Sequence, residues 1–276
     1  MSRNMPEGGS SEVRVTGEAV AGDRPSPAAR EALGAIEDDI ARGGFAFRSG
    51  AEMGTILGAR ALDEWPAFAA SWDDLGIDTY MADGGRYRRR RFCALGVTGT
   101  AVSRKEHQPH YQSRDHNQLN GGVERWFMPV HDAITGNAFA QALIRYCAML
   151  FDRASSMTSG ATPWHVEMHQ FRIEATQTEQ GAPTPEGPHR DGVDWVCVML
   201  INRTNVRSGV TQIFDPAGRS LGEFTLTDPI DTVFLDDRRV FHGVTPITPL
   251  DSERKANRDV LVLTFRREQD SNPAQG

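Results

Sequence analysis

The 276-residue sequence predicts a mainly β fold with packed helices, in which a jelly-roll barrel carries the helices on one sheet. Two observations lead to this prediction. From Trp164 onward the chain consists of short strand-like runs separated by turns, a pattern typical of a sandwich or barrel. Helical periodicity, in contrast, is confined to the segments that precede Trp164. The expected strands after that point are 164–173, 194–201, 210–214, 232–235 and 260–266.

The N-terminal part predicts a helical layer. Residues 1–24 lack the apolar centre of a secretory signal, and we expect a flexible tail there. Ser26-Pro27 is a good helix start, with a capping hydroxyl followed by proline. Apolar residues then recur at helical spacing until Gly43-Gly44. We expect a short strand at 45–47 and one or two amphipathic helices over 51–72.

The pattern turns strand-like over 79–98, with a turn at 83–85. The segment 86–92 is a dense basic run, for which two interpretations stay open. In the first, it is an outer strand whose arginines face solvent or neighbouring acids. In the second, one or two of the arginines face inward and meet an anionic substrate.

Three histidines, His107, His110 and His116, lie in the polar stretch 107–122. None of them has a carboxylate or cysteine partner at ligand-like spacing, so we interpret the stretch as part of a substrate lid and not as a metal site. A helix over 138–153 carries one apolar stripe, which indicates core packing.

Composition limits the function classes. The net charge of −7 argues against a nucleic-acid binder that relies on overall charge. Three cysteines without a paired spacing indicate a reducing compartment, and we expect a cytoplasmic protein that does not interact with a membrane. We predict one domain over 25–268, a C-terminal tail at 269–276, and a monomer or homodimer.

The strongest candidate site is formed by His189, Asp191 and His242. His189 and Asp191 are two residues apart, so on an extended strand their side chains leave the same face. His242 follows a strand-like run much later in the chain. Two imidazoles and one carboxylate form the facial triad that suits non-haem Fe(II) oxygenases. The alternatives are a local His–Asp hydrogen bond and a structural histidine at a strand end.

Arg258 is the candidate anchor for an acidic co-substrate. It precedes the apolar run 260–265, which reads as a buried strand, so its guanidinium needs a partner. Arginine pairs with a carboxylate through two parallel hydrogen bonds, which suits the distal carboxylate of 2-oxoglutarate. The alternative is a surface ion pair with Asp259 or Glu253. Arg266 shares the strand face of Arg258 and is the second choice.

The segment 185–194 resembles the iron-binding signature of the bacterial 2-oxoglutarate/Fe(II) dioxygenases that include L-isoleucine 4-hydroxylase. The resemblance covers roughly residues 45 to 268, and its further motifs are 169–173, 202–205, 209–211, 241–246 and 258–261, with 120–122 and Arg125 more loosely. It implies a double-stranded β-helix (cupin-like) fold. It also implies that His189, Asp191 and His242 hold Fe(II) and that Arg258 anchors 2-oxoglutarate.

Two positions depart from the pattern of the family. Val260 stands where many members of the wider superfamily carry a hydroxyl two residues after the anchoring arginine, so a second anchor must come from elsewhere, and Thr211 is a candidate. Ser208 stands where glycine is expected.

The activity implied by the resemblance is oxidation of an unactivated C–H bond with O2, while 2-oxoglutarate is converted to succinate and CO2. The expected substrate is a free L-amino acid or close derivative. Hydroxylation is the default outcome, and the retained Asp191 argues against halogenation, because its carboxylate occupies the position that a halide would need. Desaturation or ring closure in natural-product biosynthesis, and a non-catalytic cupin-like metal-binding domain, are the alternatives. Candidate substrate-binding residues are Glu167, His169, Gln170, Arg172, Arg125 and Trp126.

Overall fold

A computed structural model describes residues 27–117, 119–155 and 161–268. The predicted tails, 1–24 and 269–276, and the predicted capping residue Ser26 lie outside these ranges. Among the described residues, no helix is long and apolar enough to cross a membrane.

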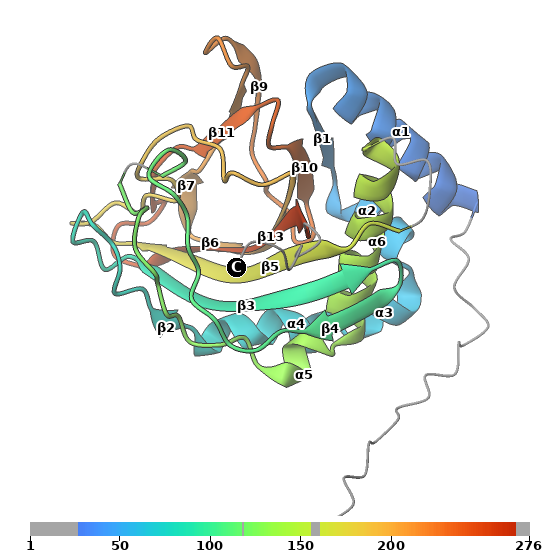
Figure 1. Cartoon of the computed structure of the whole chain (residues 1–276). Helices are drawn as coiled ribbons and strands as arrows, with labels where there is room; N and C mark the ends of the chain where they lie inside the picture. Colours follow the sequence, from blue (N-terminus) through green and yellow to red (C-terminus); the bar gives the residue numbers. More distant parts are fainter. Residues whose placement is uncertain (1–26, 118, 156–160, 269–276) are drawn as a thin grey trace, which may run out of the picture.

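The strands form three antiparallel groups (Figure 1). The large sheet has the order β1-β10-β6-β13-β5-β3-β2, and β4 pairs with β3. Its strands are β1 Phe45–Arg48, β2 Gly76–Ile77, β3 Arg88–Thr98, β4 Ala101–Arg104, β5 Trp164–Ala175, β6 Trp195–Thr204, β10 Thr232–Asp236 and β13 Ala256–Arg267. A three-stranded sheet has the order β11-β8-β9, and β12 pairs with β7. These strands are β7 Val206–Ser208, β8 Thr211–Phe214, β9 Ser220–Phe224, β11 Phe241–Val244 and β12 Ile247–Pro249.

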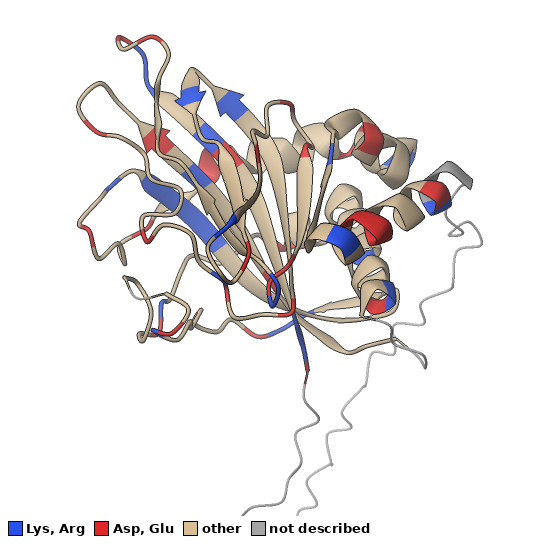
Figure 2. Ribbon diagram, turned by 90° about the horizontal axis from the view of Figure 1, so that it is seen from above, with Lys and Arg blue, Asp and Glu red and all other residues tan. Residues whose placement is uncertain are grey.

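The helices gather on one side of the large sheet, while loops gather on the other (Figures 1 and 2). They are α1 Pro27–Gly43, α2 Gly50–Leu57, α3 Ala59–Asp63, α4 Trp65–Ala70, a 3-10 turn Ser71–Asp74, α5 Asp132–Thr135 and α6 Ala138–Ala154. Asn137 starts α6 by accepting hydrogen bonds from the backbone N–H groups of Phe139 and Ala140. The buried stripe of α6 and one face of the sheet share the main hydrophobic core.

Side-chain alternation along β5 sets the two faces of the sheet. Val166 and Met168 belong to the core under the helices. Glu167 and His169, which alternate with them, face the opposite side and line a cavity. In the register of the sheet, Glu167 lies between Ala94 of β3 and Thr264 of β13. The helix-free face of the sheet therefore carries the polar groups of β5 that line the cavity.

The predicted fold class, mainly β with packed helices on a jelly-roll core, is confirmed. The helices at 27–43 and 138–153 and most of the predicted strands are present within one to four residues. Within the predicted strand region 79–98, strand structure begins only at Arg88. The strand-like run before His242 leads into β11, while β9 and β12 were not predicted from the sequence.

Candidate metal centre and cavity

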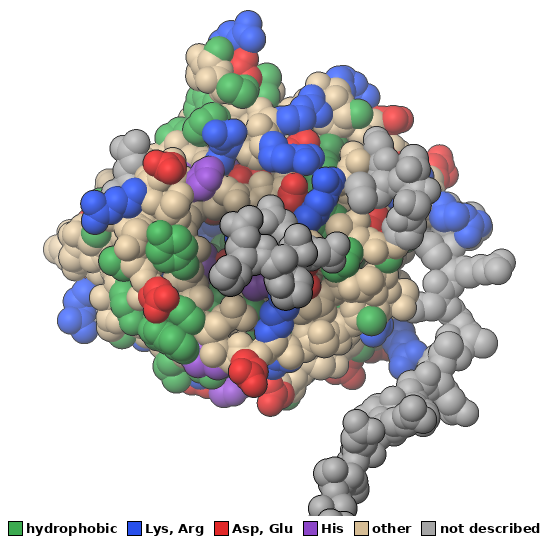
Figure 3. Space-filling model, viewed as in Figure 1, with side chains coloured by type: hydrophobic (Ala, Val, Ile, Leu, Met, Phe, Trp, Pro, Cys, Tyr) green, Lys and Arg blue, Asp and Glu red, His purple; other side chains and the backbone are tan. Residues whose placement is uncertain are grey.

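A cavity of about 330 Å³ lies on the helix-free face of the large sheet. Strands β3, β5, β6 and β13 form its floor, and β11 and the loops at 110–117 and 183–193 complete its wall. Histidine side chains are visible around the hollow of the face shown in Figure 3. The valines of β6 and β13 give the floor an apolar part between charged side chains: Val198, Val260 and Val262.

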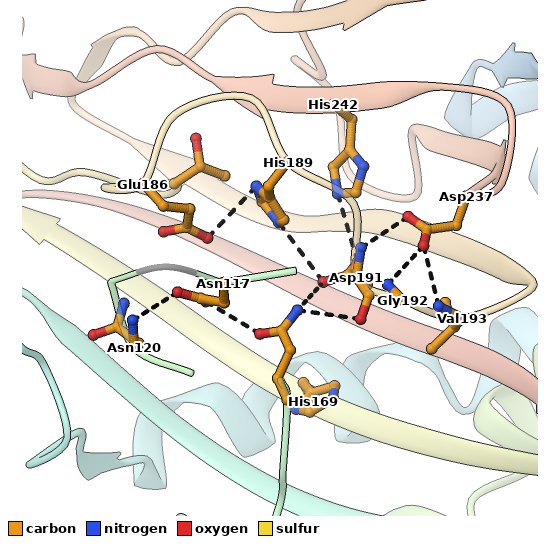
Figure 4. Close-up of polar contacts among 12 residues, drawn as sticks. Asn117, Asn120, His169, Glu186, His189, Asp191, Gly192, Val193, Asp237 and His242 are labelled. Carbon is orange, nitrogen blue, oxygen red and sulfur yellow. Dashed lines mark hydrogen bonds and ion pairs between the residues drawn. The ribbon is translucent and has the colours of Figure 1, made fainter. Parts of the chain in front are cut away.

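His189, Asp191 and His242 meet at this cavity (Figure 4). His189 precedes β6, and its backbone pairs with that of His242 on β11 through two N–H···O bonds of 2.9 Å. The carboxylate of Asp191 lies between the two rings, 3.6 Å from Nε2 of His189 and 3.6 Å from Nε2 of His242. The potential ligand atoms of the three residues lie within 4.8 Å of one another. This arrangement matches a facial triad.

The surroundings orient the donor atoms. Nδ1 of His189 lies 3.1 Å from the carbonyl oxygen of Gly187, so Nδ1–H donates there and Nε2 keeps its lone pair for a metal. The carboxylate of Asp237 accepts the backbone N–H groups of Asp191, Gly192 and Val193 at 2.8 to 3.1 Å (Figure 4). Gly192 turns the chain with a φ of 81°. Asp237 thus fixes the loop that carries the ligand Asp191.

The electrostatics of the three residues suit a cation. Burial opposes ionisation of Asp191, yet the two histidines hold its pKa below the usual value. Burial also opposes protonation of His189, but Asp191 and Glu186 raise its pKa to about 9. Burial and the neighbouring His189 lower the pKa of His242 to about 4. The anionic carboxylate therefore attracts positive charge to the point where the rings converge.

Arg258 lies on β13, in the same cavity, with an exposed fraction of 2%. Its Nε and Nη2 atoms are buried and have no hydrogen-bond partner among the described residues. Burial and the nearby Arg203 lower its pKa to about 10. A buried guanidinium with one free edge fits a bound carboxylate. The predicted alternative, an ion pair of Arg258 with Asp259 or Glu253, is not formed, since Asp259 pairs with Arg172.

Three of the predicted substrate-binding residues line the cavity: Glu167, His169 and Arg125. The predictions for the other three are wrong. Gln170 and Arg172 point to the opposite face of β5, where they bond to Ser71 and to Asp259. This follows from the period of two along a strand, which places them with Met168. Trp126 is 51% exposed and lies outside the cavity wall.

Thr211 lies on β8 opposite Val244, which does line the cavity. Thr211 itself is buried but is not part of the wall, which argues against its predicted role as a second anchor. Val260, at the position of the missing hydroxyl, lines the cavity as an apolar residue.

Sequence reasoning missed other wall residues. In the basic run, Arg88 and Arg90 are buried and face the cavity, as the second interpretation expects, while the contact with an anionic substrate stays a prediction. Their spacing of two was the available signal. Arg88 also pairs with Asp78 at 2.7 Å, as the first interpretation allows. His110 approaches Glu167, with its Nδ1 2.9 Å from Oε2. The expectation that the histidines of 107–122 have no carboxylate partner is therefore wrong for His110, because the partner comes from a strand 57 residues away.

Comparisons with known proteins agree with this geometry. A family model described as 2OG-Fe dioxygenase matches residues 69–264. The 3(1)-hydroxy-L-isoleucine 4-dioxygenase of Pantoea ananatis is 25% identical over 209 residues, which cover 76% of this chain and 83% of that protein. The L-isoleucine-4-hydroxylase of Bacillus thuringiensis is 27% identical over 157 residues, covering 56% of this chain and 64% of that protein. The crystal structure of a bsmA homolog from Methylobium petroleophilum PM1 has a TM-score of 0.78 at 36% identity, covering 88% of this chain and 96% of that chain.

Proposed function

The chain belongs to the 2OG-Fe dioxygenase family, and from this premise we propose that it oxidises an unactivated C–H bond of a free L-amino acid or close derivative. As a family member it is an Fe(II)/2-oxoglutarate-dependent dioxygenase that consumes O2. Hydroxylation is the proposed outcome. Family membership leaves a non-catalytic cupin-like domain without support.

His189, Asp191 and His242 would hold the iron, and Arg258 would hold the distal carboxylate of 2-oxoglutarate. When bound, Fe(II) and 2-oxoglutarate supply with O2 the oxidising power that removes hydrogen from carbon, and succinate and CO2 are released. The observation that carries this proposal is the convergence of the three ligand groups beside the unpaired guanidinium of Arg258 in one cavity.

The chain itself contributes positioning and exclusion of water. Nε2 of His189 is directed by the hydrogen bond of Nδ1 to Gly187, and Asp191 is held by the backbone contacts of Asp237. The side chain of Gln112 donates to the backbone oxygen of Asp191 at 3.2 Å, which ties the loop over the cavity to the metal centre. The valines of β6 and β13 keep part of the cavity floor apolar.

The most specific part of the proposal is the substrate class, a free amino acid. It is supported by the two curated relatives, whose names specify isoleucine or hydroxyisoleucine, and by the presence of both Glu167 and arginines in the cavity. Desaturation or ring closure would use the same metal-binding residues and is the second candidate outcome.

Succinate formation tests the proposal. Protein loaded anaerobically with Fe(II) and 2-oxoglutarate is mixed with each of a panel of L-amino acids and then with O2. We expect succinate that depends on one or a few amino acids, disappears in His189→Ala, and accompanies a product heavier by one oxygen atom. A product lighter by two hydrogens indicates desaturation or cyclisation. No substrate-dependent succinate across the panel contradicts the proposed substrate class.

A further inference from the structure

Arg125 is a second buried guanidinium with a free edge in the cavity. Its Nε and Nη2 atoms have no hydrogen-bond partner among the described residues, and its exposed fraction is 2%. These two N–H groups form the edge that pairs with both oxygens of a carboxylate. Arg258 leaves the same two atoms free. One cavity therefore offers two carboxylate sites, and 2-oxoglutarate accounts for one of them.

Glu167 is a carboxylate that faces the cavity and forms no direct ion pair with lysine or arginine among the described residues, although its charge interacts at longer range with those of Arg90 and Arg125. Burial opposes its ionisation, yet contacts with His110, His165 and His169 hold its pKa well below the usual value. Burial lowers the pKa of His110, and it lowers that of His169 to about 3, so both rings are neutral at neutral pH. No Lys or Arg nitrogen of the described residues lies within 4.0 Å of Glu167. The carboxylate therefore has room for one direct contact with a cationic group of a ligand.

Arg125 and Glu167 both contact His110, the first through its backbone and the second through its side chain. The backbones of His110 and Arg125 form an antiparallel pair with two N–H···O bonds of 3.0 Å, so their side chains leave on the same side. The ring of His110 then reaches Oε2 of Glu167 at 2.9 Å. Oε1 of Glu167 faces His165 at 3.7 Å, beyond hydrogen-bond distance, and is available to a ligand.

His110, Glu167 and His169 also lie close enough for a metal ion, with ligand atoms within 4.8 Å of one another. The hydrogen bonds argue against a metal. Nη2 of Arg90 can only donate, and it lies 2.6 Å from Nδ1 of His169, so the proton of that ring is on Nε2, which faces Glu167. The nitrogen of His110 that faces Glu167 donates as well. Neither of these nitrogens offers a lone pair to a metal ion.

We propose that Arg125 binds the α-carboxylate of the substrate and that Glu167 binds its α-ammonium group. This inference rests on the proposed function and adds a requirement to it: both groups of the amino acid must be free. Esters, amides and carrier-bound thioesters cannot accept the two hydrogen bonds of Arg125 as a carboxylate does. N-acyl derivatives cannot give Glu167 a positive charge. The substrate class is therefore the unblocked zwitterion.

The test compares free and blocked substrates on the wild-type protein. The panel of L-amino acids is assayed for succinate beside the methyl ester and the N-acetyl derivative of each. We expect both blocked forms of the preferred amino acid to be used about tenfold to a hundredfold less well, which corresponds to the loss of one charge-assisted hydrogen-bonded contact.

Two variants identify the residues. Arg125→Gln should remove most of the preference for the free acid over the methyl ester, and Glu167→Gln should remove the preference for the free amine over the N-acetyl form. Arg125→Lys keeps the charge but not the fork and should recover part of the preference. Glu124→Gln is the matched control, because Glu124 is the exposed neighbour of Arg125 and does not line the cavity. Anaerobic calorimetry with the preferred amino acid should show the same losses in affinity.

The outcomes separate the two proposals. If no amino acid, free or blocked, supports turnover, the proposed function is wrong and this inference falls with it. If blocked forms are used as well as free ones, or if Arg125→Gln and Glu167→Gln leave both preferences unchanged, the inference alone is overturned. The wild-type comparison decides this even where a variant does not fold.

Discussion

Replacing Arg258 by methionine should weaken co-substrate binding and at the same time stabilise the ligand-free protein. The guanidinium is fully buried, and two of its nitrogens have no partner among the described residues. In the ligand-free protein its unpaired charge therefore lowers the free energy of unfolding. A bound carboxylate of 2-oxoglutarate would pair with this charge, which favours binding. Arg258→Met removes both effects.

The magnitudes follow from the structure. Burial and the nearby Arg203 lower the pKa of Arg258 from 12.5 to about 10. A depressed pKa of a base means that its charged form destabilises the fold, here by about 3 kcal/mol below pH 10, a cost that fades as the pH rises toward 12.5. Methionine removes this cost but packs less well than the long arginine side chain. We therefore expect a net gain of roughly 1–3 kcal/mol in the free energy of unfolding. Loss of two charge-assisted hydrogen bonds should raise the Kd for 2-oxoglutarate by about a hundredfold to a thousandfold.

Urea denaturation of the ligand-free proteins measures the first effect, and anaerobic calorimetry with 2-oxoglutarate measures the second. Arg207→Met is the control, because Arg207 is exposed and does not line the cavity. It should change neither quantity appreciably. If Arg258→Met instead lowers the free energy of unfolding by several kcal/mol, the guanidinium has a structural role, and the reasoning from its unpaired atoms is refuted.

Three further substitutions test the other parts of the structure. Asp237→Asn replaces one of the two carboxylate oxygens that accept backbone N–H groups around Asp191 with an NH2 group, which can only donate. Metal affinity should then fall about tenfold to a hundredfold in an anaerobic fluorescence titration. Unchanged affinity would show that the loop is held by other contacts. Arg172→Ala leaves the buried Asp259 without its ion-pair partner. The free energy of unfolding in urea should fall by about 2–4 kcal/mol, while the activity per folded molecule is retained. A selective loss of substrate affinity would instead restore the role first predicted for Arg172. Gly50→Ala places a Cβ atom 2.2 Å from the carbonyl oxygen of Pro229. The melting temperature should fall by an amount equivalent to roughly 1–3 kcal/mol, while the affinity for 2-oxoglutarate stays constant. An unchanged melting temperature would contradict the close contact.

The sequence by itself determined the fold class, the location of the described helices before Trp164, and the three residues that meet at the candidate metal centre. Local rules are sufficient for these features. Alternation along 164–173 already separates Glu167 and His169 from Gln170 and Arg172, so the two wrong substrate residues contradict a pattern that was visible in the sequence. Ser208 adopts a φ of 65°, which explains why glycine is expected at that position.

Only the tertiary structure decided which charges face the cavity and which of them have partners. The sequence favoured an outer strand whose arginines face solvent or neighbouring acids, but the pairing of β3 with β5 places Arg88 and Arg90 inside. His110 meets Glu167 because a loop folds back over the sheet, and Arg125 joins them through a backbone bridge to His110. Such contacts join residues far apart in the chain. Periodicity reports only the face on which a side chain lies, and the partner that it meets there depends on the packing of distant segments.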